Sequence, residues 1–185
     1  MLFENNRATE KGGAIAYNLY RPEMVNVTFV NNTAPYGPNI ASYPVKVVLE
    51  GTNSSALELN DVASGQLISD EIKLSVVDFE NQITSTNIKG FVSIEPIELD
   101  TDSYGQSSEG LVNGVATFRS LILSAKPGSK QVQFKVKTNA IDTSIMLKQF
   151  GKTKSFICIG TSSIQDPFLV NFRYCKPGEI DVGSR

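Results

Sequence analysis

The sequence predicts an all-β protein in which a short stack of β-coils is followed by a β-sandwich. Three observations lead to this fold class. A segment near the amino end recurs once, which indicates stacked repeats. Several short alternating strands follow it, separated by turn residues. The chain is also rich in β-branched residues and in Asn, Ser and Thr, and it lacks the Ala, Leu, Glu and Lys heptads that are typical of helical proteins.

The repeat occupies residues 3–41. The motif FxxN at residues 3–6 recurs at residues 29–32, and GGAIA at residues 12–16 has its counterpart GPNIA at residues 37–41. A coil of a few short strands cannot bury its own apolar face, so such coils stack with about 4.8 Å between equivalent residues. We therefore expect the following pairs in the interior: Phe3 over Phe29, and Ile15 over Ile40.

Asn6 would then lie over Asn32 and form an amide ladder, because each amide can donate to one neighbour and accept from the next. The glycine pair at residues 12–13 suits a corner where the backbone needs a positive φ or has no room for a side chain.

The FxxN and GGAI motifs resemble the repeats of the polymorphic outer membrane protein family and of related right-handed β-helix surface proteins, including large ones from ciliates. The second copy departs from the pattern, since it has Gly37-Pro38 where the family has two glycines. End repeats are usually atypical, so this departure fits a terminal coil. The resemblance covers about the first quarter of the chain. It implies terminal coils of a right-handed parallel β-helix that acts as a passive stalk or adhesive surface, and it carries over no catalytic residue.

Composition argues against several classes of function. A net charge of −2 without basic clusters argues against a nucleic-acid partner. The chain has no His, the commonest general base and metal ligand, so we predict no cofactor and no metal. No apolar run is long enough for a direct membrane span. No signal peptide precedes the repeat, so we expect a fragment whose partners are neighbouring domains of the same longer chain.

Three Asn-x-Ser/Thr triplets favour an extracellular or cell-surface location. They begin at Asn26, Asn31 and Asn53, which are therefore candidates for glycosylation. Such triplets also arise by chance, so they give mild support to a secreted context.

From residue 43 onward the pattern is that of short strands joined by turns. Residues 43–49 predict a strand that leads away from the coils, and the polar residues 50–66 mark a boundary. Asn113-Gly114 is the strongest hairpin signal in the chain, because Asn-Gly takes the type I′ turn that matches strand twist. Strict alternation over residues 131–137 places three side chains on the core face: Val132, Phe134 and Val136.

The order of these signals resembles immunoglobulin-like modules of bacterial adhesins and other surface proteins. The resemblance is carried by the DxxN turn at residues 78–81, by NGVATF at residues 113–118 and by PGS at residues 127–129. The core Trp and bridging Cys pair of antibody domains are absent, so the resemblance is to the disulfide-free branch. We therefore expect three parts: terminal β-helix coils in 1–49, an immunoglobulin-like β-sandwich in 50–150, and a C-terminal strand pair in 151–185 that begins a Cys-rich module.

Cys158 and Cys175 are the only cysteines, and three alternatives stay open for them. A bridge between them in an oxidising compartment would add about 3 kcal/mol. Two reduced cysteines would instead behave as small apolar residues. Finally, residues 174–179 (YCKPGE) resemble the opening of the Cys-rich, ephrin-receptor-like modules of many ciliate surface proteins, which implies that Cys175 pairs beyond residue 185.

The acidic residues give no strong catalytic or metal-binding pattern. The densest group is Glu95, Glu98 and Asp100; paired carboxylates can hydrolyse glycosides, but these lie outside the repeat. An EF-hand loop starting at Asp100 would need Glu at its twelfth position, where Leu111 stands. A weak surface calcium site is less favoured than a solvated acidic loop; it would use Asp100, Asp102 and Glu109.

Together these features predict a non-enzymatic structural or spacer fragment of a large extracellular or cell-surface protein. One alternative is an adhesin that binds a glycan or a protein ligand. A second alternative is a fragment of a β-helix carbohydrate-active enzyme.

Overall fold

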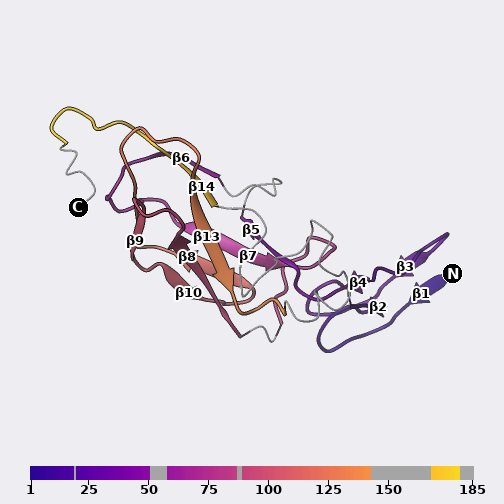
Figure 1. Ribbon diagram of the computed structural model, residues 1–185. Helices are drawn as coiled ribbons and strands as arrows, with labels where there is room; N and C mark the ends of the chain where they lie inside the picture. The colour runs from indigo at the N-terminus through magenta and orange to yellow at the C-terminus, as the bar shows by residue number, and fades with distance from the viewer. Residues whose placement is uncertain (19, 51–57, 87–88, 143–167, 180–185) are drawn as a thin grey trace.

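The structure, a computed structural model, describes residues 1–18, 20–50, 58–86, 89–142 and 168–179. Every regular element in these residues is a β-strand, which confirms the all-β fold class. Within the same ranges no helix is long and apolar enough to cross a membrane. Figure 1 shows two parts: short strands β1–β4 extend from one end of larger sheets and carry the N-terminus at their tip.

The first part is a stack of two coils held together by parallel strand pairing. β1 (Leu2–Glu4) pairs with β3 (Thr28–Val30), and β2 (Ile15–Ala16) pairs with β4 (Ile40–Ala41). Phe3 lies opposite Phe29 and Ile15 opposite Ile40, so the register predicted from the repeat is confirmed. The two phenylalanine rings stack with their centroids 5.6 Å apart, within the range favoured for aromatic pairs.

Glycines at equivalent corners allow the coils to lie this close. Gly12 and Gly37 both have a positive φ, 61° and 58°, which favours a residue without a Cβ atom. A Cβ atom on Gly13 would lie 2.2 Å from the carbonyl oxygen of Pro38 in the other coil. The glycine pair of the repeat therefore serves both purposes that the sequence suggested, a left-handed corner and a close approach between coils.

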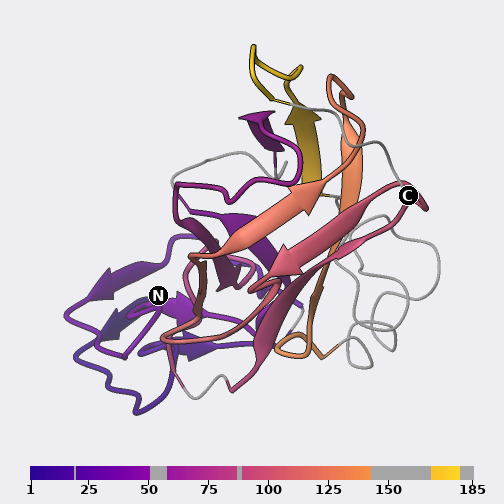
Figure 2. The same cartoon turned by 90° about the vertical axis from the view of Figure 1, so that its left-hand side faces the viewer.

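The second part consists of sheets that share one apolar core. A three-stranded antiparallel sheet has the order β11-β7-β5, formed by β5 (Lys46–Leu49), β7 (Ile72–Val77) and β11 (Val115–Phe118). A five-stranded sheet has the order β10-β8-β13-β14-β6, formed by β6 (Glu58–Val62), β8 (Phe91–Pro96), β10 (Ser108–Gly110), β13 (Val132–Thr138) and β14 (Phe168–Phe172). β9 (Asp102–Gly105) and β12 (Leu121–Ser124) form a further antiparallel pair. Figure 2 shows the same two parts after a quarter turn.

The core of this second part follows the predicted alternation along β13. Val132, Phe134 and Val136 are buried, and the Phe134 ring lies with its centroid 6.5 Å from that of Phe172 on β14. Residues of both larger sheets belong to one continuous cluster of buried apolar side chains. Burial of these side chains is the main favourable term for folding of the sheets.

The predicted Asn-Gly hairpin is also confirmed. Asn113 and Gly114 have φ values of 51° and 80°, the left-handed conformations that a type I′ turn requires. Val112 and Val115 exchange two backbone hydrogen bonds of 2.9 and 3.0 Å across the turn. The turn residues therefore fix the register of the strand that follows, β11.

Two strands lie in sheets that the predicted domain boundaries do not suggest. β5 falls within 1–49, yet it pairs with β7, because Val47 is buried in the core of the sheets. β14 falls within 151–185, yet it lies between β13 and β6, because Phe168, Val170 and Phe172 are completely buried there. The rest of the predicted C-terminal strand pair, residues 151–167, lies outside the described residues.

Candidate functional site: a polar joint between coils and sheets

A set of polar contacts connects both coils to the sheets, and we call it the joint. On the sheet side it consists of residues 78–86, which directly follow β7. On the coil side it consists of residues 10–18, 20 and 21 of the first coil and residues 36–43 of the second. Figure 1 shows this region where the coils meet the end of β7.

Asp78 is the centre of the joint, and its side chain is completely buried. One carboxylate oxygen accepts hydrogen bonds from the backbone N–H groups of Glu80 and Gln82, at 2.9 and 3.0 Å. The other oxygen accepts from the backbone N–H of Ser42, at 2.9 Å, and from Gln82 Nε2, at 3.4 Å. A buried carboxylate is costly unless its oxygens are hydrogen-bonded, so this group holds its own turn and the second coil together.

Ser42 makes the reciprocal contacts from the coil side. It follows β4 and is completely buried, and its Oγ accepts a hydrogen bond of 2.9 Å from the backbone N–H of Phe79. Its carbonyl oxygen accepts from Tyr36 Oη at 3.0 Å and from Lys11 Nζ at 3.3 Å. Lys11 Nζ also lies 3.4 Å from the centroid of the Tyr43 ring, a cation–π contact. Burial lowers the pKa of this lysine.

Glu80 joins the first coil to the same turn. Its Oε1 accepts hydrogen bonds from Tyr17 Oη at 2.6 Å and from Arg21 Nε at 2.7 Å. The hydrogen bond from Arg21 holds the pKa of the Glu80 carboxyl below its ordinary value, because it favours the charged form. Burial, followed by the hydrogen bond to Glu80, raises the pKa of the Tyr17 hydroxyl.

Two further contacts extend the joint. Gln82 Nε2 donates to the carbonyl oxygen of Ile40 in β4 at 2.8 Å, and Thr86 Oγ1 donates to the carbonyl oxygen of Glu10 at 2.9 Å. The sheets are thus tied to each of the two coils at several separate points. Several contacts on different elements restrict bending and twisting at once, whereas a single contact would leave a hinge.

The amide pair predicted for the coils lies on neighbouring rungs. Asn6 Nδ2 donates to Asn32 Oδ1 at 2.9 Å, and the backbone N–H of Asn6 donates to the same oxygen at 3.0 Å. Asn32 is buried and its Nδ2 donates onward to the carbonyl oxygen of Phe3 at 3.1 Å. These side chains hold the coils to each other and lie outside the joint.

The glycosylation candidates lie on the outside of the coils. Asn26 and Asn31 are exposed and have φ values of 52° and 50°. Asn5, which precedes Asn6 as Asn31 precedes Asn32, has a similar φ of 56°, so the coils share this corner conformation. Asn53 lies outside the described residues.

Cys175 is exposed and carries a free thiol in the described residues, and Cys158 lies outside them. Cys175 belongs to a C-terminal turn held by Arg173, whose guanidinium donates to both carboxylate oxygens of Glu179 at 2.7 Å. This ion pair and the backbone N–H of Lys176 lower the pKa of Glu179 to about 2.

The acidic residues singled out from the sequence do not converge on one site. Glu95 forms an ion pair with Lys137, whereas Glu98 and Asp100 lie in an exposed turn. Asp102 accepts a hydrogen bond of 2.5 Å from Tyr104 Oη. Within the ranges that the structure describes, no three His, Cys, Asp or Glu side chains come together to hold a metal ion.

Sequence reasoning identified the turn at residues 78–81 but missed its role. One signal was present: an Asp directly after a strand, whose side chain can accept hydrogen bonds from backbone N–H groups two and four residues later. The contacts across the joint could not be predicted, because Ser42 and Tyr17 are distant from this turn in the sequence.

Residues 1–17, which contain the FxxN and GGAI motifs, match the model of the Chlamydia polymorphic membrane protein repeat. The first coil therefore is similar to a repeat of membrane proteins, which is consistent with a fragment of a cell-surface protein. This match does not extend to the immunoglobulin-like module or to ciliate proteins. A comparison with curated proteins gives no match.

Proposed function

We propose that the chain is a non-enzymatic spacer segment of a large cell-surface protein, in which the joint transmits orientation from a β-stack to a sandwich module. In this proposal the two coils are the terminal coils of a right-handed parallel β-helix. The sheets that follow are an immunoglobulin-like sandwich. Its partners are the neighbouring domains of the same longer chain.

The observation that carries the proposal is the completely buried Asp78 carboxylate, which binds its own turn and the backbone of Ser42. Transfer of a charge from water into the protein interior is unfavourable unless hydrogen bonds compensate for it. The buried carboxylate is therefore stable only while all of its donors stay in place. Bending at the joint would separate the carboxylate from the N–H of Ser42. The joint therefore favours one orientation of the coils relative to the sheets.

The similarity of residues 1–17 to a membrane-protein repeat supports the surface location. The exposed Asn26 and Asn31 fit glycosylation there, if the host adds N-linked sugars. An adhesin would need a surface that selects a ligand, and an array of glycans would detect a carbohydrate-binding one. Binding of several related glycans would show that the segment acts as an adhesin and not as a spacer.

The orientation at the joint can be measured as a distance distribution between two spin labels. The labels are attached at two exposed positions, Thr9 in the first coil and Ser108 in β10. Each label is coupled to a ketone-bearing unnatural amino acid, so the cysteines of the chain stay unchanged. We expect a single narrow distribution. A matched pair at Ser108 and Gln133, within one sheet, gives the width that the labels alone produce.

Asp78→Asn tests the cause of the rigidity. The variant keeps the shape of the side chain but turns an NH₂ group toward N–H donors, so we expect the distance across the joint to broaden while that within the sheet stays narrow. Asp70→Asn, at an exposed position outside the joint, is the matched control. A broad distribution in the unchanged protein would rule out a rigid spacer.

A further inference from the structure

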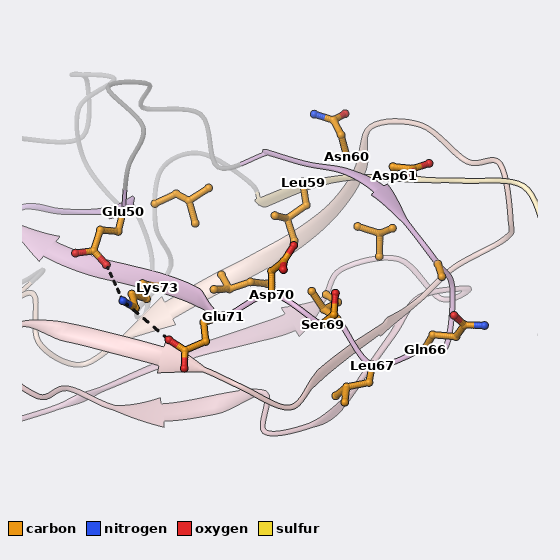
Figure 3. A pocket seen from close by; sticks show the side chains of 15 residues that line it. Glu50, Leu59, Asn60, Asp61, Gln66, Leu67, Ser69, Asp70, Glu71 and Lys73 are labelled. Carbon is orange, nitrogen blue, oxygen red and sulfur yellow. Dashed lines mark ion pairs between the residues drawn. The ribbon is translucent and has the colours of Figure 1, made fainter.

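A groove of about 620 Å³ lies along β6, on the sheets and away from the joint. One wall is β6 and the following residues, and the other is formed by residues 66–73, which lead into β7. Figure 3 shows Leu59 and Asp61 on the first wall and Ser69 and Asp70 on the second. The volume is within the range of about 300–1,000 Å³ that is usual for ligand sites.

The groove follows the edge of a sheet. Consecutive residues of β6 line the groove, from Leu59 to Val62. β6 is the last strand of the five-stranded sheet and pairs only with β14 in the described residues. Within the described residues no strand pairs with its other edge, and a strand edge of this kind can accept a further extended strand.

The lining of the groove includes both apolar and acidic side chains. Leu59, Ile68 and Ile72 supply apolar surface. Glu50 lies 3.8 Å from Lys73, and Glu71 binds Arg119 at 2.8 Å and Lys73 at 4.0 Å, so these two carboxylates already have cationic partners. Asp61 and Asp70 are exposed on opposite walls. Within the described part of the chain neither forms a direct ion pair, although the pKa of Arg173, raised chiefly by its hydrogen bond to Glu179, is also raised by the charge of Asp61.

Asp61 also limits how a strand can pair with β6. It has a φ of 58°, and the register between β6 and β14 shifts at this point. Such a bulge interrupts regular pairing, so the edge that remains regular is Glu58–Asn60. A run this short gives little affinity through backbone hydrogen bonds alone, so the two exposed carboxylates, Asp61 and Asp70, would supply much of the selectivity.

We propose that this groove binds an extended peptide segment in which lysine or arginine alternates with apolar residues. The backbone of the peptide pairs with the free edge of β6, its apolar side chains lie against Leu59 and Ile68, and its cationic side chains reach Asp61 and Asp70. This site is independent of the spacer role, because no residue of the joint lines the groove.

The test is fluorescence anisotropy of the whole chain with a labelled short peptide of alternating lysine and valine. We expect saturable binding that weakens as the ionic strength rises, because exposed ion pairs are screened. A peptide of alternating glutamate and valine should not bind. An otherwise identical lysine peptide with N-methylated amides should bind at least about tenfold more weakly, because it cannot donate to the strand edge.

Asp61→Asn and Asp70→Asn test the two carboxylates. Asn tolerates the left-handed backbone at residue 61, so the first variant changes charge and little else. We expect each variant to bind the lysine peptide about threefold more weakly, and the double variant about tenfold. Asp100→Asn, at an exposed acidic position outside the groove, should bind normally. Three results would overturn the proposal. The double variant could bind the lysine peptide as tightly as the unchanged protein does, the N-methylated peptide could bind as tightly as the unmethylated one, or the lysine peptide could show no saturable binding.

Discussion

The coils and the sheets are both made of β-strands, but different interactions hold them together. The largest completely buried side chains all belong to the sheets, including Phe118, Phe134, Phe168 and Phe172. The coils bury Tyr17 and Tyr36, whose hydroxyl groups are hydrogen-bonded at the joint, and otherwise small or polar groups such as Ala41, Asn32 and Ser42. Their Phe3 and Phe29 rings stack on each other but are only partly buried.

This difference means that the sheets are stable through their own apolar core, whereas the coils depend on contacts with their neighbours. Apolar burial contributes about 25 cal/mol per Å² removed from water, so the sheets have their own driving force. Two short coils do not, because repeats of this kind gain stability from their neighbours. In the described residues the second coil contacts the first coil and, through the joint, the sheets. The predictions below test this division, beginning with the largest effect.

Replacement of Phe134 by Ala should destabilise the sheets strongly. The side chain is completely buried against Phe172, and loss of such a ring typically costs about 3–5 kcal/mol. Chemical denaturation followed by tyrosine fluorescence measures the change in the free energy of unfolding. We expect the coils to lose their order in the same transition, because the joint depends on β7 and its turn.

Phe29→Ala is the matched change in the coils. Its ring is partly exposed and stacks on one partner, so we expect a loss of about 1 kcal/mol, with the sheets unaffected. If Phe29→Ala cost as much as Phe134→Ala, the coils would have a core of their own and the division would be wrong.

Gly13→Ala should separate the coils while the sheets remain folded. The added Cβ atom would lie 2.2 Å from the carbonyl oxygen of Pro38 and 2.7 Å from that of Thr33, and backbone atoms can relieve this only by moving apart. We expect a cost of about 1–3 kcal/mol, as for other overpacked sites. Hydrogen exchange should become faster at the amides of Ala8 and Tyr17, which donate to carbonyl groups of the second coil.

Gly110→Ala is the control for Gly13→Ala, because a Cβ atom at Gly110 meets no atom within 4 Å. Unchanged exchange in both variants would mean that the coils do not pack through Gly13. Faster exchange throughout β13 in Gly13→Ala would show that the sheets depend on the coils, the reverse of what we expect.

Local signals account for the parts of this fold that could be predicted. The repeat predicted which residues lie opposite each other in the coils, since equal spacing implies equivalent rungs. The Asn-Gly turn and the alternation along β13 depend on neighbours in sequence, and both were correct. The position of β14 depends on pairing with β13 and β6, which no local pattern encodes. The joint was missed for the same reason, because Asp78 and Ser42 are brought together only by the fold.

The smallest predicted effect is the pH dependence of the joint through Glu80. The folded pKa of this carboxyl is below its ordinary value of 4.5, chiefly because Arg21 donates a hydrogen bond to it. A carboxyl with a lowered pKa adds stability that is fully present above the ordinary value and is lost as the pH falls through the folded value.

Glu80→Gln keeps an acceptor for Tyr17 but carries no charge. Since Arg21 is about half exposed, we expect a loss of about 0.5 kcal/mol at neutral pH. The difference from the unchanged protein should shrink below pH 4.5, where Glu80 itself becomes protonated. Denaturation at neutral pH and at about pH 3 measures both values, with Glu98→Gln as the exposed control. A difference that stayed constant down to the lower pH would show that the charge of Glu80 does not stabilise the joint.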